Sequence, residues 1–470
     1  MNSLWSFLGT PRLSRADFAR EALASLVVFL IALPLSLGVA LASGVPPALG
    51  LVSAIIGGLV VGRLAGSPLQ VSGPAAGLAV IVFDAVQQHG LAALGAVVLI
   101  AGLLQLLGGA LRLGRWFSLV PGSVTSGMLA GIGALILFSQ VHVLMDAAPT
   151  GAPLSDLTAL PSRLLDVVLG GPGASAQALA IGLGTLAMIV LWERHRPRSL
   201  RSLPGALVGV GAVVAMSALT ALPVAMVAIP ERLLPDGLGW LPALSQPGVW
   251  ASGIVLGLVA SAEAMLSASA VDELHHDRPK TDHDRELFAQ GVGNVVAGVF
   301  GALPVTGVIV RSSANVDAGA RTRLPAMLHA AALLVLVVVL PSLLAYIPTT
   351  ALAAVLVYTG ARLLAPFKLL AFWRTDRVEA VVFVSTAVAV VAVGLLEGVL
   401  LGLAMAGLVR LIRSHDLRIV AHTDDELQHV DLHLMQLVEV EVDRIAVRHR
   451  VEGGLQPRGG QEGRRAAQVQ

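Results

Sequence analysis

Two short stretches decide the fold: Val71-Ser72-Gly73-Pro74-Ala75-Ala76-Gly77 and, 234 positions later, Val305-Thr306-Gly307-Val308-Ile309-Val310-Arg311. In each, a hydroxyl residue and a glycine follow an extended apolar approach and precede sequence that favours a helix. This pattern predicts a helix that begins in the interior of the molecule. Inside a membrane, two such half-helices would begin near the midplane with their free N–H groups turned inward, which makes a site for an anion.

The composition around these stretches is that of a polytopic membrane protein. Of the 470 residues, 56% are hydrophobic and only 13% are charged, whereas about a quarter of residues are charged in soluble domains. The net charge of +1 gives no signal for nucleic acid, so lipid and not nucleic acid is the expected surrounding. The chain has no cysteine, which excludes disulfides and thiolate metal sites.

Apolar runs of about 20 residues predict fourteen membrane spans. The first seven lie near 21–43, 46–62, 73–87, 91–111, 119–144, 174–193 and 204–224, and the second seven near 250–271, 287–302, 307–317, 324–346, 349–363, 378–394 and 396–412. The third and tenth are too short to cross a bilayer alone, so we predict a short strand plus a half-helix in each. Seven spans per half invert the second half, which predicts an all-α fold with a 7+7 inverted repeat.

The distribution of basic residues gives the orientation. With the N-terminus in the cytoplasm, most loop arginines and lysines fall on the cytoplasmic side, as the positive-inside rule requires. Residues 1–20 are expected to form an amphipathic segment on the cytoplasmic surface, with a frayed tail as the alternative. The outer segments 145–173 and 225–249 are interpreted as loops with up to one surface helix each. Residues 413–470 are expected to form a short cytoplasmic tail.

Glu263 is the strongest single candidate for function. It lies inside the predicted eighth span, where an ionised carboxylate costs roughly 2.5–3.5 kcal/mol and therefore needs a cavity and a partner. Ser267 follows at i+4 on the same helix face and could complete an oxygen site for Na+, with Thr306 as a further ligand. Alternatively, Glu263 itself binds and releases a proton. A protonated carboxyl that only joins two helices is the structural alternative.

The two opening stretches supply the predicted anion site. Ser72 and Thr306 are expected to cap their half-helices by accepting an N–H two or three residues on. The N–H groups expected to remain free for a ligand belong to Gly73, Ala75, Ala76, Gly307, Val308 and Ile309. Each helix N-terminus contributes about +0.5 charge, so two of them suit a small monoanion.

Other polar residues in the spans have more than one interpretation. Arg311 either adds positive potential to the site or pairs with Glu263 or Asp317. Gln105 and Asn294 are typical of contacts between helices. The histidines and aspartates between His275 and Asp284 could bind a metal, but they lack a fixed ligand spacing, so a solvated loop is preferred. The sequence contains no nucleophile triad, phosphate loop or zinc signature, so we expect no enzyme and no cofactor.

Several motifs resemble the sulfate permease (SulP) family of anion transporters over about residues 20–412. The first half contributes Leu33-Pro34-Leu35-Ser36-Leu37-Gly38-Val39-Ala40, Gly44-Val45-Pro46-Pro47 and the stretch Gln70 to Gly77. The second half contributes Arg285-Glu286-Leu287-Phe288-Ala289-Gln290-Gly291-Val292-Gly293-Asn294 and Arg311-Ser312-Ser313-Ala314-Asn315.

The resemblance implies a core domain of spans 1–4 and 8–11 that moves like an elevator against a gate domain of spans 5–7 and 12–14. It also implies a substrate between the starts of spans three and ten, and a sodium ion at Glu263 and Ser267. A homodimer is common in such proteins. Only some 55 residues follow the last span, so a complete cytoplasmic STAS domain is not expected.

The sequences of these motifs are similar to those of short bacterial members of the family that are often associated with carbonic anhydrase. This similarity favours bicarbonate over sulfate as the substrate. We therefore predict a secondary transporter of bicarbonate by Na+ symport in the inner membrane, with both termini cytoplasmic. H+-coupled transport of sulfate or a dicarboxylate is the alternative within this class. An anion channel is a third possibility. A nucleobase transporter is disfavoured, because it would require a second acidic residue near Gly307.

Overall fold

The computed structural model describes residues 14–412, except 118–119, 149–152, 171–172, 198–199, 201–202, 221–223, 228–238, 276–278, 340 and 395–396. Residues up to Ala406 belong to one compact unit. Of the second unit, only 407–412 are described, and they are helical. The predictions for the first 13 residues and for the tail 413–470 lie outside the described residues.

The first half of the chain folds into helices interrupted by one short strand. In chain order these are α2 (Arg15–Ala42), α3 (Pro47–Ile56), η1 (Gly57–Val61), α4 (Gly62–Leu64), β1 (Ser72–Gly73), η2 (Ala76–Leu78), α5 (Ala79–His89), η3 (Leu91–Ala93), α6 (Leu94–Ala110), α7 (Gly114–Phe117), α8 (Gly122–Leu144), α9 (Pro153–Leu169), α10 (Ala174–His195) and α11 (Gly205–Leu219). α2 begins after Ser14, whose Oγ accepts the N–H of Asp17, so the first helix includes the end of the predicted N-terminal segment.

The second half repeats this pattern. It contains η5 (Leu241–Ser245), α12 (Pro247–Glu273), α13 (His283–Val299), β2 (Thr306–Gly307), α14 (Ile309–Asp317), α15 (Leu324–Val339), η6 (Pro341–Tyr346), α16 (Thr349–Leu363), α17 (Pro366–Thr375) and α18 (Arg377–Ala392), followed by helical residues 397–412. Each predicted span overlaps a helix of this series, which confirms the mostly helical membrane fold. Within the described residues, seven helices are long and apolar enough to cross a membrane, so the count of fourteen stays a prediction.

The two predicted breaks are present. Before the first break, η1 adds one π-helical turn to α3 and α4 follows it directly, after which residues 65–71 lead through a series of bends into β1. Before the second break, Gly301 ends the α13 region with a φ of 60°, a conformation that glycine adopts without strain. β1 and β2 pair antiparallel, with Ser72 opposite Gly307 and Gly73 opposite Thr306. Two segments far apart in sequence therefore meet, and a short helix follows each.

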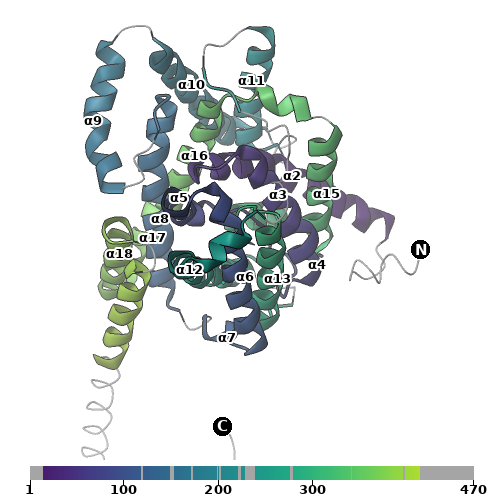
Figure 1. Ribbon diagram of the computed structural model, residues 1–470, viewed down its shortest axis with the longest axis vertical. Helices are drawn as coiled ribbons and strands as arrows, with labels where there is room; N and C mark the ends of the chain where they lie inside the picture. Colours follow the sequence, from purple (N-terminus) through teal and green to yellow (C-terminus); the bar gives the residue numbers. More distant parts are fainter. Residues whose placement is uncertain are drawn as a thin grey trace, which may run out of the picture. The chain divides into compact units, whose positions relative to one another are not determined.

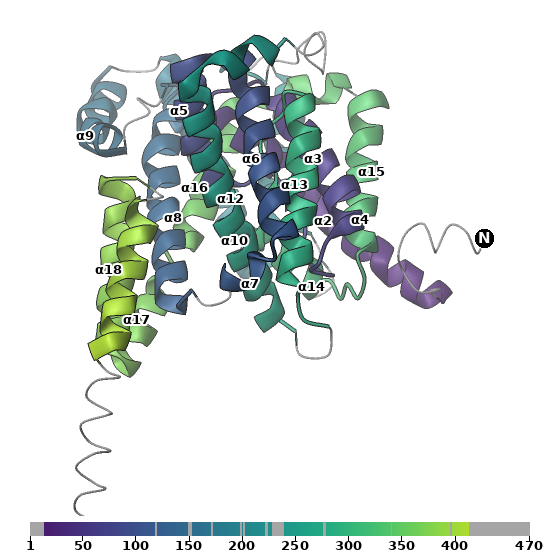
Figure 2. The ribbon, with the colours of Figure 1, turned by 60° about the horizontal axis from the view of Figure 1, so that its bottom comes forward.

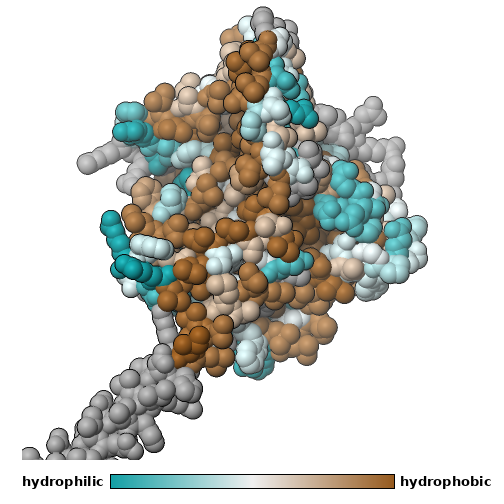
Figure 3. All heavy atoms as spheres, turned by 90° about the vertical axis from the view of Figure 1, so that its left-hand side faces the viewer, coloured by the Kyte–Doolittle hydropathy of each residue, from teal (hydrophilic) through white to brown (hydrophobic). Residues whose placement is uncertain are grey.

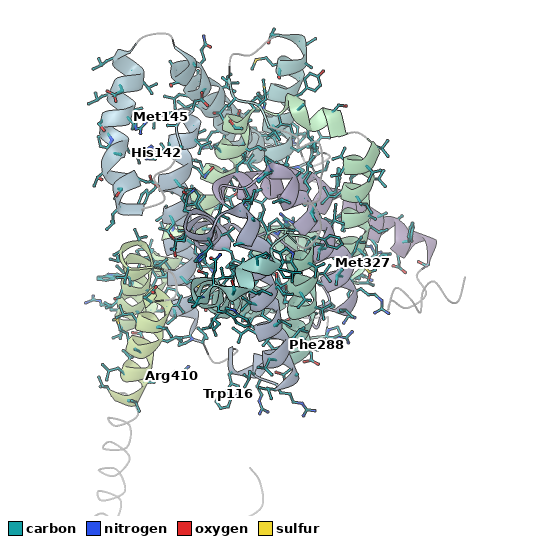
Figure 4. All side chains as sticks on the ribbon, viewed as in Figure 1. Trp116, His142, Met145, Phe288, Met327 and Arg410 are labelled. Carbon is teal, nitrogen blue, oxygen red and sulfur yellow. The ribbon has the colours of Figure 1, made fainter. Side chains whose placement is uncertain are left out.

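Most long helices run side by side around this pair, whereas α9 does not. Figure 2 shows α6, α12 and α13 packed along one another, whereas α9 lies across their direction. α9 is the surface helix that the outer segment 145–173 allowed. His142 of α8 lies beside it (Figure 4), with Nε2 2.9 Å from the carbonyl oxygen of Asp156. α17 (Figure 1) lies between the predicted spans 349–363 and 378–394, where no helix was predicted.

The apolar residues divide between the interior and the surface that faces lipid. The largest buried cluster joins α2, α3, α6, α12 and α13, and a second joins α2 to α10, α11, α15 and α16. The side of the molecule that carries α9 and α18 in Figure 1 is largely hydrophobic at its surface (Figure 3). On α18, for example, Val381 and Val388 are 49% and 59% exposed. Exposed apolar surface of this extent is expected where lipid replaces water.

Candidate functional site

A cavity lies beside the paired strands, at the beginning of both half-helices. Its volume is about 440 Å³, including space that is open to solvent. The lining residues come from both broken segments and from α2, α8, α12 and α16: Leu35, Ala75, Ala76, Gly77, Leu129, Ile132, Glu263, Ser267, Val308, Ile309, Val310, Thr359 and Leu363. The two stretches that open the sequence analysis thus contribute to one site.

Glu263 and Ser267 of α12 face this cavity together. Glu263 is only 8% exposed, and its Oε2 has no hydrogen-bond partner within the described residues. Gly77 makes room for it, because a Cβ at this position would lie 2.6 Å from Glu263 Oε1. The carboxylate and the start of the first half-helix are therefore adjacent. The predicted juxtaposition of Glu263 and Ser267 is present, and their role in binding a cation stays a prediction.

The predicted anion-binding residues divide into two groups. Ala75, Ala76, Val308 and Ile309 line the cavity. The remaining residues, Ser72, Gly73, Thr306, Gly307 and Arg311, lie outside the cavity lining in the strand pair and in α14. Small side chains at positions 75 and 76 leave the backbone of the first half-helix open to a ligand.

The prediction of side-chain caps is wrong. Neither half-helix has a side-chain cap. The Oγ of Ser72 accepts a hydrogen bond from Gln290 Nε2 at 2.8 Å, and Thr306 Oγ1 donates to the carbonyl of Ala260 at 3.3 Å. Both hydroxyls thus form hydrogen bonds with neighbouring helices, α13 and α12. Each residue lies in its strand, too far before the first helical turn to cap it.

The prediction of a free N–H at Val308 is also wrong. This N–H donates to the carbonyl of Val71 at 3.0 Å, which extends the pairing of the two strands by one bond. Pairing could not be foreseen from either stretch alone, because each supplies the partner of the other. Val308 still lines the cavity through its other atoms.

Arg311 is completely buried on α14. Its Nη2 donates to Ser36 Oγ at 2.9 Å, and Nε and Nη1 have no hydrogen-bond partner within the described residues. Nη1 lies against Gly73, where a side chain would collide with it. The interpretations that paired Arg311 with Glu263 or Asp317 are therefore wrong: neither carboxylate accepts a bond from it. Its charge remains close to the strand pair.

Sequence reasoning missed several residues of the site. Leu129 and Ile132 of α8 and Thr359 and Leu363 of α16 line the cavity, but nothing in their local sequence sets them apart from lipid-facing positions. Gln70 was also missed: its Nε2 donates to the carbonyl of Ala264 at 3.3 Å, and the side chain occupies the space beside Gly307. The glycine in the strand is the signal that could have indicated this close approach.

One secondary interpretation is confirmed, the contact between helices at Gln105 and Asn294. Asn294 Nδ2 donates to Gln105 Oε1 at 2.7 Å, so these residues do join helices. In the segment between α12 and α13, Asp282 accepts the N–H of Arg285 and caps α13. Residues 276–278 lie outside the described part, and the described residues hold no group of three or more metal-ligating side chains. The preference for a solvated loop over a metal site between His275 and Asp284 stays a prediction.

Comparison with known proteins identifies the family. The model of the sulfate permease family matches residues 18–386. The chain belongs to this family. Its fold agrees with that of the transmembrane domain of a cyanobacterial bicarbonate transporter BicA, with a TM-score of 0.70 and 25% identity over 82% of this chain and 98% of that one. It also agrees with SLC26A9, with a TM-score of 0.75 and 17% identity over 87% of this chain and 68% of that one.

Relatives within the sulfate permease family carry different substrate names. YvdB of Bacillus subtilis, provisionally named as a sulfate transporter, is 25% identical over 83% of this chain and 73% of its own length. The bicarbonate transporter BicA of Picosynechococcus is 28% identical over 75% of this chain and 62% of its own length. The chain is thus a multi-pass membrane protein and an anion transporter of the sulfate permease family, and not an enzyme.

Proposed function

We propose that the chain is a secondary active transporter that carries bicarbonate by Na+ symport through an elevator movement. The observation that carries this proposal is the cavity in which the starts of both half-helices meet Glu263 and Ser267. One small space thereby offers a site for an anion and a site for a cation. The name of the bicarbonate transporter BicA, a relative at 28% identity, supports bicarbonate as the anion.

The anion is proposed to bind at the starts of the two half-helices. The first N–H groups of a helix have no partner within the helix, and the aligned peptide dipoles favour negative charge there. Ala75 and Ala76 allow a ligand to approach the backbone, and Ile309 begins α14. The buried charge of Arg311 adds positive potential behind the strand pair.

The cation is proposed to bind at Glu263. Its carboxylate faces the cavity with Oε2 unpartnered within the described residues, and the hydroxyl of Ser267 lines the same wall. Oxygen ligands of this kind suit a hard cation such as Na+. Thr306 contacts α12 at Ala260, one turn before Glu263, so it is the proposed third contributor.

The position of the cavity is consistent with alternating access. One wall comes from the broken segments, α2 and α12, which belong to the proposed core. The other wall comes from α8 and α16, which belong to the proposed gate. Movement of the core along the gate would carry both ions across the membrane with the site intact.

H+-coupled transport of sulfate or a dicarboxylate is the second candidate. The provisional name of YvdB as a sulfate transporter favours sulfate, and a buried carboxyl such as Glu263 can take up a proton in place of Na+. An anion channel is a further candidate. It would show currents far above transporter turnover and no dependence on a Na+ or H+ gradient.

Uptake of labelled bicarbonate and of sulfate into proteoliposomes, with and without a Na+ gradient, tests the proposal. We expect bicarbonate uptake that requires the Na+ gradient, and we expect Glu263→Gln to abolish this requirement or the uptake itself. Sodium-independent uptake that survives Glu263→Gln would contradict the assignment of the coupling ion. Uptake of sulfate alone would contradict the choice of anion.

The proposal also covers the location, the oligomeric state and a functional partner of the protein. We propose an inner-membrane location with both termini in the cytoplasm, a homodimer, and a functional link to carbonic anhydrase, which would supply or consume the transported bicarbonate. These proposals rest on the loop charges and the family resemblance.

A further inference from the structure

The buried face of α13 carries three polar side chains whose role the transport mechanism has not used. Glu286, Gln290 and Asn294 follow one another at intervals of four residues and are completely buried. This spacing places them on one side of the helix, over a length of about 12 Å. A buried polar side chain is costly unless it is hydrogen-bonded, so their partners indicate their purpose.

The first two residues of this row hold the segment from Gly66 to Ser72, which leads into β1. Glu286 Oε2 accepts the N–H groups of Gly66 and Ser67 at 2.8 and 2.9 Å. Gln290 Nε2 donates to Ser72 Oγ at 2.8 Å and also to Glu286 Oε1 at 2.8 Å. The segment is therefore fixed to α13 at both of its ends.

The third residue holds the segment that leads into β2. Asn294 Oδ1 accepts the N–H of Val305 at 2.6 Å, and its Nδ2 donates to the carbonyl of the same residue at 2.8 Å. The side-chain amide thus makes the two bonds that a neighbouring strand would make. Val305 directly precedes β2, so this contact fixes the approach to the second half-helix.

α13 packs closely against α6. Its glycines allow close packing on α6: a Cβ at Gly291 or at Gly298 would lie 2.5 Å from the backbone nitrogen of Leu106 or Leu99. On α6, Gly109 lies against the backbone of Phe288, which is labelled in Figure 4. The row of polar side chains therefore projects from a helix that packs closely against α6.

The first repeat lacks such a row. The offset of 234 residues relates Glu286, Gln290 and Asn294 to Val52, Ile56 and Val60, all apolar. α3 contributes a single comparable bond, from Ser53 Oγ to the carbonyl of Leu303 at 2.9 Å. The symmetry of the repeat is thus broken at these positions, and one helix holds both segments.

We propose that Glu286, Gln290 and Asn294 are positioning residues that hold the two broken segments in register, so that both half-helices begin at the same cavity. The proposal rests on the proposed transport function, because register matters only if the two helix starts share a ligand. None of the three lines the cavity, so they act through the segments that do.

Hydrogen–deuterium exchange of the purified full-length chain tests this proposal without a transport assay. Asn294→Leu removes the partner of the Val305 N–H, and we expect exchange in peptides covering 303–308 to rise about tenfold. Glu286→Leu should have the same effect on peptides covering 66–73. If Glu286→Leu does not fold, Glu286→Gln keeps the side-chain volume but has a single acceptor oxygen, which can serve either the N–H groups of Gly66 and Ser67 or the amide of Gln290, but not both. Gln140→Leu is the matched control, since Gln140 is almost as completely buried and, among the described residues, bonds only its neighbour Ser139.

The result that would overturn the proposal is exchange that is unchanged, or that rises equally in all helices. Transport kinetics provide the second readout. We expect the apparent KM for the anion to rise about tenfold in Asn294→Leu, with partial rescue in Asn294→Asp, which keeps an acceptor for Val305. A lower maximal rate at unchanged KM would contradict the proposal. If the native chain transports no anion, the proposed function fails, whereas the exchange experiment still decides whether these residues hold the segments.

Discussion

At the scale of single residues, the site depends on how closely Glu263 approaches the first half-helix. The sequence singled out Glu263 because an ionised carboxylate within an apolar span is costly and is therefore a candidate for function. Ser267 was singled out as its neighbour on the same helix face, and both residues line the cavity. The contact of Glu263 with Gly77 could not be predicted, because it joins residues almost two hundred positions apart. Because Gly77 has no side chain, the carboxylate of Glu263 can lie directly against the backbone at this position.

Gly77→Ala should therefore disturb the coupling site. The new Cβ would lie 2.6 Å from Glu263 Oε1, so the carboxylate has to move. We expect the concentration of the coupling ion for half-maximal transport to rise about tenfold, as overpacking by one methyl group typically costs 1–3 kcal/mol. Gly184→Ala in α10 is the control, since no atom of the described residues lies within 4 Å of its added Cβ. Equal coupling-ion dependence in both variants would contradict this contact.

At the scale of elements, the breaks in the third and tenth spans were predictable because a hydroxyl residue followed by glycine, Ser72-Gly73 and Thr306-Gly307, interrupts two apolar stretches at matching positions. Their pairing as β1 and β2 could not be predicted from local sequence, because it depends on how the two distant segments come together in the fold. The unpredicted bond from Val308 to Val71 has the same origin. α17 was missed because its aromatic and basic residues are typical of a loop as well as of a short surface helix.

Ser312 connects the two segments and offers a test of their attachment. Its Oγ accepts the N–H of Val71 at 2.9 Å and donates to the carbonyl of Val308 at 2.8 Å. Ser312→Ala leaves the buried N–H of Val71 without a partner, so we expect a loss of about 1–3 kcal/mol in stability, seen as a lower unfolding temperature in detergent. In the described part of the chain, the hydroxyl of the neighbouring Ser313 bonds only within α14, so Ser313→Ala should change stability by less than about 0.5 kcal/mol. Equal effects would argue against this link between the segments.

At the scale of the whole molecule, composition and the positions of basic residues indicate a polytopic membrane protein, and the fold of the sulfate permease family confirms that class. The number of spans and their orientation stay predictions, because helix length and apolar content alone single out seven helices among the described residues.

The absence of cysteine makes the orientation directly measurable. Leu113→Cys and Leu169→Cys place one thiol each at exposed positions, 43% and 79% exposed in the native chain, in loops predicted on opposite sides of the membrane. A membrane-impermeant maleimide applied to intact cells should label Leu169→Cys, and should label Leu113→Cys only after permeabilisation. The reverse pattern would invert the proposed orientation.

The central claim is that a small anion occupies the cavity where both half-helices begin. Protection of Ala76→Cys from a small thiol reagent tests it most directly, because Ala76 lines that cavity and the chain has no other thiol. We predict that bicarbonate slows the labelling of Ala76→Cys at concentrations near its apparent KM and leaves the labelling of Leu113→Cys unchanged. Labelling of Ala76→Cys at the same rate with and without every anion that the protein transports would contradict the claim.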